Sequence, residues 1–168
     1  MILALWFFSL LVAPTSQSPV SGTTTGNGKS GLAVGWQYEQ LAGATHKASL
    51  ASTNQIQLPY PAKGGSTVTL TIRAKTGSPS TAYFSVTNGL LTKSYQGGDA
   101  KVRFGSGSNK TYVLTPAANG TGNLVFVDNA RQFISQLKAA KSMTVQFTLA
   151  NQPFPPVQFN ITGLRWTH

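Results

Sequence analysis

Five side chains of this sequence belong to the types that most readily perform acid–base or metal chemistry. They are Glu39, His46, Asp99, Asp128 and His168, and the chain has no cysteine. Most catalytic and metal sites are assembled from carboxylates, imidazoles and thiolates. Thirteen Lys and Arg residues stand against three Asp and Glu residues, which gives a formal net charge of +10. This composition predicts a protein without catalytic residues, cofactor or metal ion.

The hydrolytic alternatives depend on very few residues. A Ser/His/Asp hydrolase needs an internal histidine as base, and His46 is the one candidate. It lies beside Lys47 in a polar stretch, and no G-x-S-x-G motif accompanies it. A glycosidase needs two carboxylates across a cleft. Glu39 and Asp99 are the pair available for that role, because Asp128 suits a helix N-cap. A hydrolase using His46 remains an alternative hypothesis.

The first residues indicate export. Residues 2–13 form an uncharged apolar run, too short for a membrane span of about 20 residues but of the length of a signal-peptide core. We predict a signal peptide over residues 1–13, with membrane association through an uncleaved segment as the alternative. Residues 14–35 are rich in Pro, Ser, Thr and Gly, which is typical of a flexible leader. After this leader we predict a single domain over residues 36–168.

The domain alternates polar and apolar residues with a period of two, which indicates β-strands. In residues 66–75, for example, Val68, Leu70 and Ile72 alternate with polar neighbours. The dipeptide Asn88-Gly89 is a tight-turn signal. Charged residues are only 10% of the chain, so the surface is built mainly from uncharged polar residues. Strands are predicted at residues 46–52, 66–75, 82–86, 90–95, 100–104, 111–115, 123–127, 143–149 and 157–161. About eight short strands at this spacing predict a mainly β fold, an antiparallel β-sandwich.

One segment follows the helical period instead. Phe133, Ile134 and Leu137 fall on one face of a helix predicted at about 129–140. Asp128 is the predicted N-cap, and Lys138 lies in the last turn, where the helix dipole favours cations. The apolar face of this amphipathic helix is expected to cover the sheet.

The order of elements in the C-terminal half resembles a known set of proteins. The residues that carry the resemblance are 101–104 (KVRF), 124–128 (LVFVD), 133–141 (FISQLKAAK) and 159–164 (FNITGL). The pattern, over about residues 36–166, resembles small exported bacterial β-sandwich proteins. These include the invasion-associated locus B family, accessory proteins of type VI secretion and prophage-borne envelope lipoproteins. The resemblance implies an exported, envelope-associated, non-enzymatic module, and it implies no functional residues.

The basic residues are the main surface chemistry of the chain. Arg73 and Lys75 lie on the polar face of one predicted strand, and Lys101 and Arg103 on that of another. If the two strands are neighbours, the four cations form one stripe. Such a patch would attract an anionic envelope polymer or anionic lipid head groups. The alternatives are a surface that serves solubility alone, or nucleic acid, although no specific nucleic-acid fold signature is present.

These observations predict an exported binding or assembly module of the bacterial cell envelope. We expect it to be periplasmic, associated with the outer membrane, or secreted. Its expected partner is an envelope protein or an anionic envelope polymer. One alternative is a prophage-encoded envelope protein that interferes with phage entry. A lysozyme inhibitor is disfavoured, because a basic inhibitor would repel a basic lysozyme.

Overall fold

The alternating sequence folds into strands that make up most of the domain. The computed structural model describes residues 35–58, 64–92, 95–149 and 152–168, all within one compact unit. The predicted signal peptide (1–13) and the predicted leader up to residue 34 lie outside the described residues. The strands are β1 (Gln37–Leu41), β2 (Thr45–Gln57), β3 (Gly65–Lys75), β4 (Thr81–Val86), β5 (Gly98–Phe104), β6 (Asn109–Pro116), β7 (Leu124–Val127), β8 (Ser142–Leu149), β9 (Gln152–Pro153) and β10 (Val157–Asn160). The predicted mainly β fold is confirmed.

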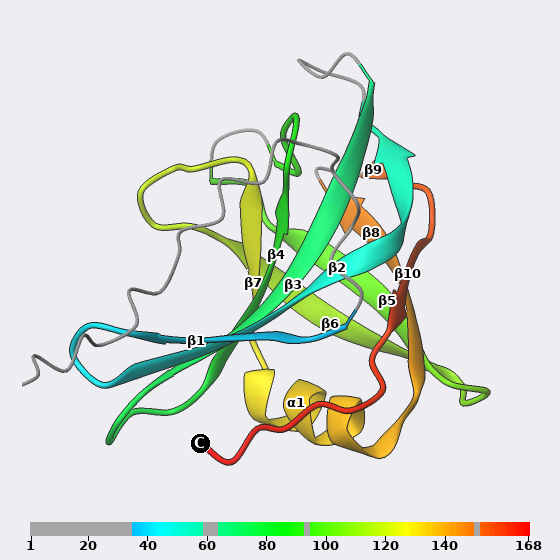
Figure 1. The fold of residues 1–168 in the computed structure, drawn as a ribbon. Helices are drawn as coiled ribbons and strands as arrows, with labels where there is room; N and C mark the ends of the chain where they lie inside the picture. Colours follow the sequence, from blue (N-terminus) through cyan, green and yellow to red (C-terminus); the bar gives the residue numbers. More distant parts are fainter. Residues whose placement is uncertain (1–34, 59–63, 93–94, 150–151) are drawn as a thin grey trace, which may run out of the picture. The chain divides into compact units, whose positions relative to one another are not determined.

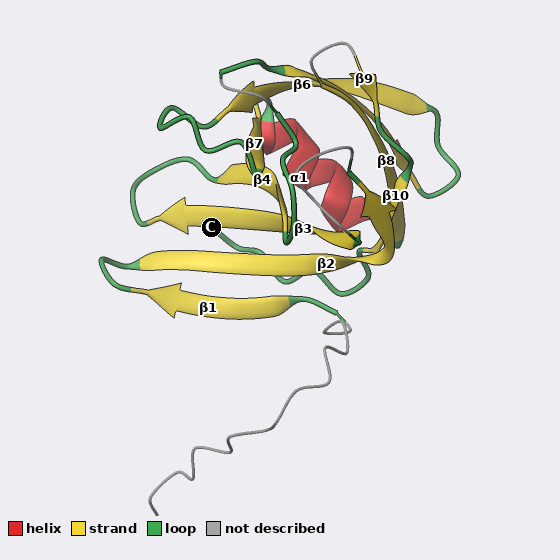
Figure 2. Cartoon of the chain, turned by 90° about the horizontal axis from the view of Figure 1, so that it is seen from above, coloured by secondary structure: helices red, strands yellow, loops and turns green. Residues whose placement is uncertain are grey.

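All strands belong to one antiparallel sheet (Figure 1). Its order is β1-β2-β3-β4-β7-β6-β5-β8-β10, and the short β9 pairs with β8. The sheet is open. Its strands form one continuous hydrogen-bonded order, in which the two stacked sheets of the predicted sandwich are not distinguished. The sheet curves strongly (Figure 2), and the buried side chains of the core lie on its inner face. The single helix, α1 (Ala130–Ala139), lies at one end of the curl (Figure 1).

The core is organised around Phe84 on β4, whose side chain is fully buried. Its ring centroid lies 5.8 Å from that of Phe133 on α1, 5.1 Å from that of Phe147 on β8 and 6.0 Å from that of Phe159 on β10. The contacts with Phe133 and Phe147 are edge-to-face, which is a preferred geometry for aromatic pairs. Strands distant in the sheet order therefore meet through aromatic side chains.

A local irregularity in β2 brings the two ends of the sheet together. The register between β2 and β3 shifts between Ala51 and Gln55. Next to this shift, the Asn54 side chain donates to the Pro156 carbonyl (2.9 Å) and accepts from the Gln158 amide (2.8 Å) on β10. The side-chain amide thus forms the pair of hydrogen bonds that a neighbouring strand would form. Asn54 joins β2 to β10 without a backbone ladder between them.

The helix prediction is confirmed, with a different cap. Asn129, rather than Asp128, is the N-cap, because its side-chain oxygen accepts from the Gln132 amide at 3.2 Å. Asp128 instead accepts a hydrogen bond from the Thr115 hydroxyl on β6. Both residue types cap helices well, and the helix begins one residue later than the sequence pattern suggested, at Ala130. Within the described residues, α1 is neither long nor apolar enough to cross a bilayer.

The predicted hairpin after Asn88-Gly89 is wrong. Gly89 does adopt a positive φ of 85°, as a tight turn requires, but residues 90–92 do not return as a strand. The free side of β4 pairs with β7 instead, with Phe84 opposite Val125. Leu91 and Thr92 donate their amides to the Gly122 carbonyl, so this segment is a loop bound beside β7. Residues 93–94 of the predicted strand lie outside the described residues.

Tyr112 on β6 provides a first test of the core. It is only 4% exposed, and no hydrogen-bond partner for its hydroxyl lies among the described residues. A buried hydroxyl without a partner is costly, so Tyr112→Phe is expected to raise the free energy of unfolding by about 1 kcal/mol. Urea denaturation at neutral pH measures this change, and a destabilised Tyr112→Phe variant would contradict it.

The same substitution predicts a difference at alkaline pH. Burial raises the pKa of the Tyr112 hydroxyl above its ordinary value of about 10. Above that value the unfolded chain loses this proton before the folded protein does, so the stability of the wild type falls as the pH rises towards the folded pKa. The Tyr112→Phe variant lacks this contribution, so its advantage over the wild type should grow above pH of about 10.

Asn54 provides a second test, because both the oxygen and the nitrogen of its side-chain amide bond to backbone groups at β10. We expect Asn54→Ala to lower the free energy of unfolding by about 1–3 kcal/mol, since the Gln158 amide and the Pro156 carbonyl lose their partner. Asn109→Ala is the matched control, because Asn109 is an exposed strand residue. Equal urea midpoints for the two variants would contradict the role given to Asn54.

Candidate functional site

The predicted basic stripe depended on two strands being neighbours, and they are not. Arg73 and Lys75 lie on β3, and Lys101 and Arg103 lie on β5. Strands β4, β7 and β6 separate β3 from β5 in the sheet. The structure therefore places the four cations in two groups. We call Lys101 and Arg103 the β5 cation pair.

The group on β3 is partly neutralised by a carboxylate. Arg73 lies directly opposite Lys47 on β2, and Lys47 lies opposite Glu39 on β1, so the three side chains share one face. The Lys47 ammonium is 3.2 Å from a Glu39 carboxylate oxygen. This pair is solvent-accessible and contributes at most about 1 kcal/mol to stability. Its effect on the surface is to offset one positive charge near Arg73.

The β5 cation pair has a different environment. Lys101 lies opposite Thr111 on β6 and Gln146 on β8. Arg103 lies opposite Asn109 and Thr144 on the same two strands. Both cations are exposed, and among the described residues neither forms an ion pair. Two unpaired cations are thus flanked on both sides by hydroxyl and amide groups.

The candidate catalytic residues are dispersed. Glu39 is on β1 and Asp99 is on β5, and strands β2, β3, β4, β7 and β6 lie between them in the sheet. His46 stacks on His168, with ring centroids 3.8 Å apart and planes at 13°. In the described part of the chain, no hydrogen bond or ion pair joins His46 to a carboxylate. Within that part, no three His, Asp or Glu side chains come together as a metal site would require.

The His46–His168 stack belongs to a larger contact between the start and the end of the described chain. Residues 161–168 follow β10 and run past β1 (Figure 1). Trp166 donates its indole N–H to the Ser80 hydroxyl at 3.1 Å, and this hydroxyl donates to the His168 carbonyl at 3.1 Å. We call residues 161–168 the C-terminal segment.

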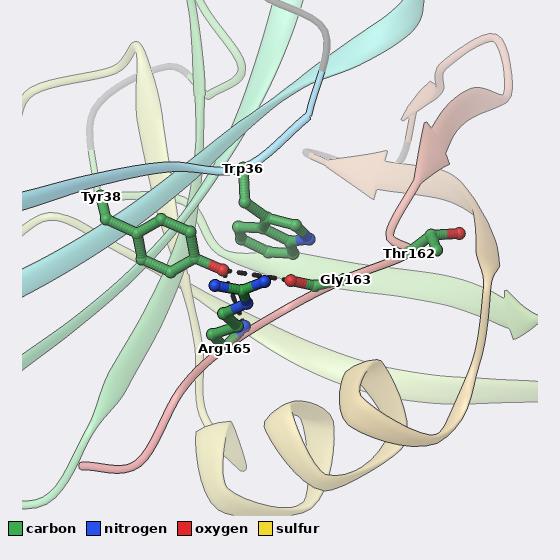
Figure 3. Close-up of a pocket in the computed structure, with 5 residues that line it drawn as sticks. All are labelled: Trp36, Tyr38, Thr162, Gly163 and Arg165. Atoms are coloured by element: carbon green, nitrogen blue, oxygen red, sulfur yellow. Dashed lines mark hydrogen bonds between the residues drawn. The ribbon is translucent and has the colours of Figure 1, made fainter.

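A pocket of about 310 Å³ lies between β1 and the C-terminal segment (Figure 3). We call it the aromatic groove, and its lining residues are Trp36, Tyr38, Thr162, Gly163 and Arg165. The Trp36 indole N–H donates to the Ile161 carbonyl at 3.2 Å. The Tyr38 hydroxyl accepts from the Arg165 amide at 2.7 Å and donates to the Gly163 carbonyl at 3.4 Å. The polar atoms of both rings are therefore occupied by backbone groups, and these bonds fix the rings in place.

Sequence reasoning did not find this groove. It placed the start of the domain at Trp36 but assigned no strand to residues 37–41 and no role to Tyr38 or Arg165. Tyr38 and Arg165 are separated by 127 positions in the sequence, and no local pattern indicates that they meet.

Comparison with known proteins gave no match to a family model, to a curated protein or to a solved structure. The resemblance to small exported envelope proteins therefore stays a prediction. What the protein binds must be inferred from the surface chemistry of this chain alone.

The hydrogen bond from the Arg165 amide to the Tyr38 hydroxyl is expected to anchor the C-terminal segment measurably. In Tyr38→Phe the Arg165 amide loses its acceptor, so hydrogen exchange at Arg165 should become at least severalfold faster. Tyr95→Phe is the matched control, because Tyr95 is 68% exposed. Unchanged exchange at Arg165 in Tyr38→Phe, measured by NMR, would show that this hydrogen bond does not hold the segment.

Proposed function

We propose that this protein is a non-enzymatic, exported binding or assembly module of the bacterial cell envelope, and that its basic surface binds an anionic envelope polymer. The observation that carries the proposal is the β5 cation pair. Lys101 and Arg103 are exposed, unpaired within the described residues, and lie opposite neutral hydrogen-bonding side chains on β6 and β8, while Asp99, two residues before Lys101, shares their face of β5. An anion approaching this face meets no repelling carboxylate directly opposite either cation.

The charge balance of the whole chain supports the same proposal. With a formal charge of +10, the protein attracts polyanions over a distance set by the ionic strength. The Lys47–Glu39 contact is the only ion pair among the described residues. Most cations are consequently available to an external anion. The flanking Thr, Asn and Gln side chains can donate hydrogen bonds to phosphate or carboxylate oxygens.

The non-enzymatic part of the proposal rests on how the reactive groups are distributed. Lys47 hydrogen-bonds to Glu39, Thr115 to Asp128, and His46 stacks on His168. General acid–base catalysis depends on a titratable side chain held within hydrogen-bond reach of the reacting proton. Among the described residues, no hydrogen bond or ion pair joins either histidine to a carboxylate that would orient it as a base. An open polar strand face with exposed cations is suited to binding an extended polymer.

Charge-removal variants test the site. Binding of polyphosphate and of polygalacturonate to the full chain is measured by calorimetry at several salt concentrations. Lys101→Gln/Arg103→Gln is expected to weaken both interactions about 10- to 30-fold, because each cation near an anionic surface contributes about 1 kcal/mol. Affinity should also fall as salt rises.

The matched control removes the same two charges from β3. Arg73→Gln/Lys75→Gln should weaken binding clearly less, since Glu39 already offsets charge beside Arg73. Equal losses in the two double variants would show that only net charge matters and would contradict a site on β5. Absence of binding to either polymer, or a cytoplasmic location after cell fractionation, would contradict the proposed function itself.

A further inference from the structure

The aromatic groove contains one cation, the Arg165 guanidinium, which has no hydrogen-bond or ion-pair partner among the described residues. Arg165 is exposed, and its backbone amide is bound by Tyr38. No hydrogen bond or ion pair of its guanidinium lies among the described residues. A guanidinium presents donors in a planar fork that matches a carboxylate. The groove therefore offers one unpaired anion-binding group beside two aromatic rings.

The rings define the other half of the ligand. Because the Trp36 N–H and the Tyr38 hydroxyl are engaged by backbone groups, the rings offer a ligand mainly their apolar surfaces. Small-molecule sites typically combine aromatic walls with a few polar groups, in volumes from about 300 Å³ upwards. A cavity of about 310 Å³ is at the small end of that range and suits one ring-sized unit. Such a ligand has an apolar ring face and carries one carboxylate.

The position of the groove connects it to the β5 cation pair. Arg103 on β5 lies opposite Thr144 on β8, and Thr144 lies opposite Gln158 on β10. Gln158, Asn160 and Thr162 are exposed and alternate with buried residues, so they follow one outer face along the chain. Thr162 lines the groove. Polar residues of β8 and β10 thus lie between the β5 cation pair and Thr162 of the aromatic groove.

We infer that the aromatic groove binds one acidic sugar residue, a pyranose ring with a carboxylate, of an anionic envelope polysaccharide. The apolar face of the sugar lies against Trp36 and Tyr38, and its carboxylate is bound by the Arg165 guanidinium. This inference deepens the proposed function, on which it rests for the polymer as a whole. It adds a specific ring-binding position to an otherwise electrostatic surface.

A short uronide tests the groove separately from the basic face. Digalacturonate is titrated into the full chain, and the Trp36 indole N–H resonance is followed by NMR. We expect a ligand-dependent shift of this resonance, and at least tenfold weaker binding in Arg165→Gln. Arg131→Gln is the matched control, because Arg131 is an exposed arginine on α1, away from the groove, and the same charge is removed. The uncharged disaccharide cellobiose should bind at least tenfold more weakly than digalacturonate.

Three results would overturn the inference. Equal affinities in Arg165→Gln and Arg131→Gln would show that the uronide binds elsewhere, as would an unshifted Trp36 indole resonance. Cellobiose binding as tightly as digalacturonate would exclude carboxylate recognition. Displacement of the uronide by a tenfold lower concentration of an acidic peptide would assign the groove to protein binding instead.

The polymer variants separate the failure of the inference from the failure of the proposed function. Arg165→Gln should leave polyphosphate binding within about twofold of the wild type, since polyphosphate has no sugar ring. Lys101→Gln/Arg103→Gln could weaken polyphosphate binding while digalacturonate does not bind in the groove. In that case the proposed function is supported and the assignment of the groove to an acidic sugar is contradicted. Conversely, digalacturonate could bind in the groove while neither polymer binds to the protein. In that case polymer binding by the β5 cation pair is contradicted and the groove assignment is supported.

Discussion

The packing of aromatic rings against Phe84 is the interaction on which the rest of this structure depends. A single antiparallel sheet has two edges and one apolar face that must be removed from water. Here the face is buried by curvature, because rings from α1, β8 and β10 all contact Phe84 on β4. Those contacts help to hold β10 near β2, where the Asn54 side chain bridges them. The core therefore determines where the outer faces of the sheet lie.

The curl also explains why the aromatic groove exists. Once β10 is held beside β2, the chain that follows it must pass β1, the edge strand of the sheet. An edge strand exposes backbone groups and is usually protected in some way. Trp36 and Tyr38 contact the C-terminal segment through side-chain hydrogen bonds, which holds that segment beside β1 while leaving a pocket between them. The position of the aromatic groove is thus a consequence of how one open sheet curves.

The sequence pattern predicted individual elements better than their partners. The period of two located β3, β5 and β8, and the helical period located α1, because each of these elements buries a regular face. It could not predict that β4 pairs with β7 rather than with residues 90–95, since alternation in one strand carries no information on its neighbour. For the same reason it could not decide whether Arg73 and Arg103 share one stripe, and in the structure β4, β7 and β6 lie between their strands. The groove was inaccessible to local reasoning, because its residues come from the two ends of the described chain.

The scarcity of carboxylates connects the fold with the proposed function. Stability here comes from apolar packing and from hydrogen bonds of neutral side chains such as Asn54 and Asn129, neither of which needs an acidic partner. Lysines and arginines can therefore remain on the outer faces without internal counter-ions. An exposed cation keeps its attraction for an external anion only while no carboxylate in the same protein competes for it. Among the described residues, Lys101, Arg103 and Arg165 form no ion pair with a carboxylate, whereas Lys47 does.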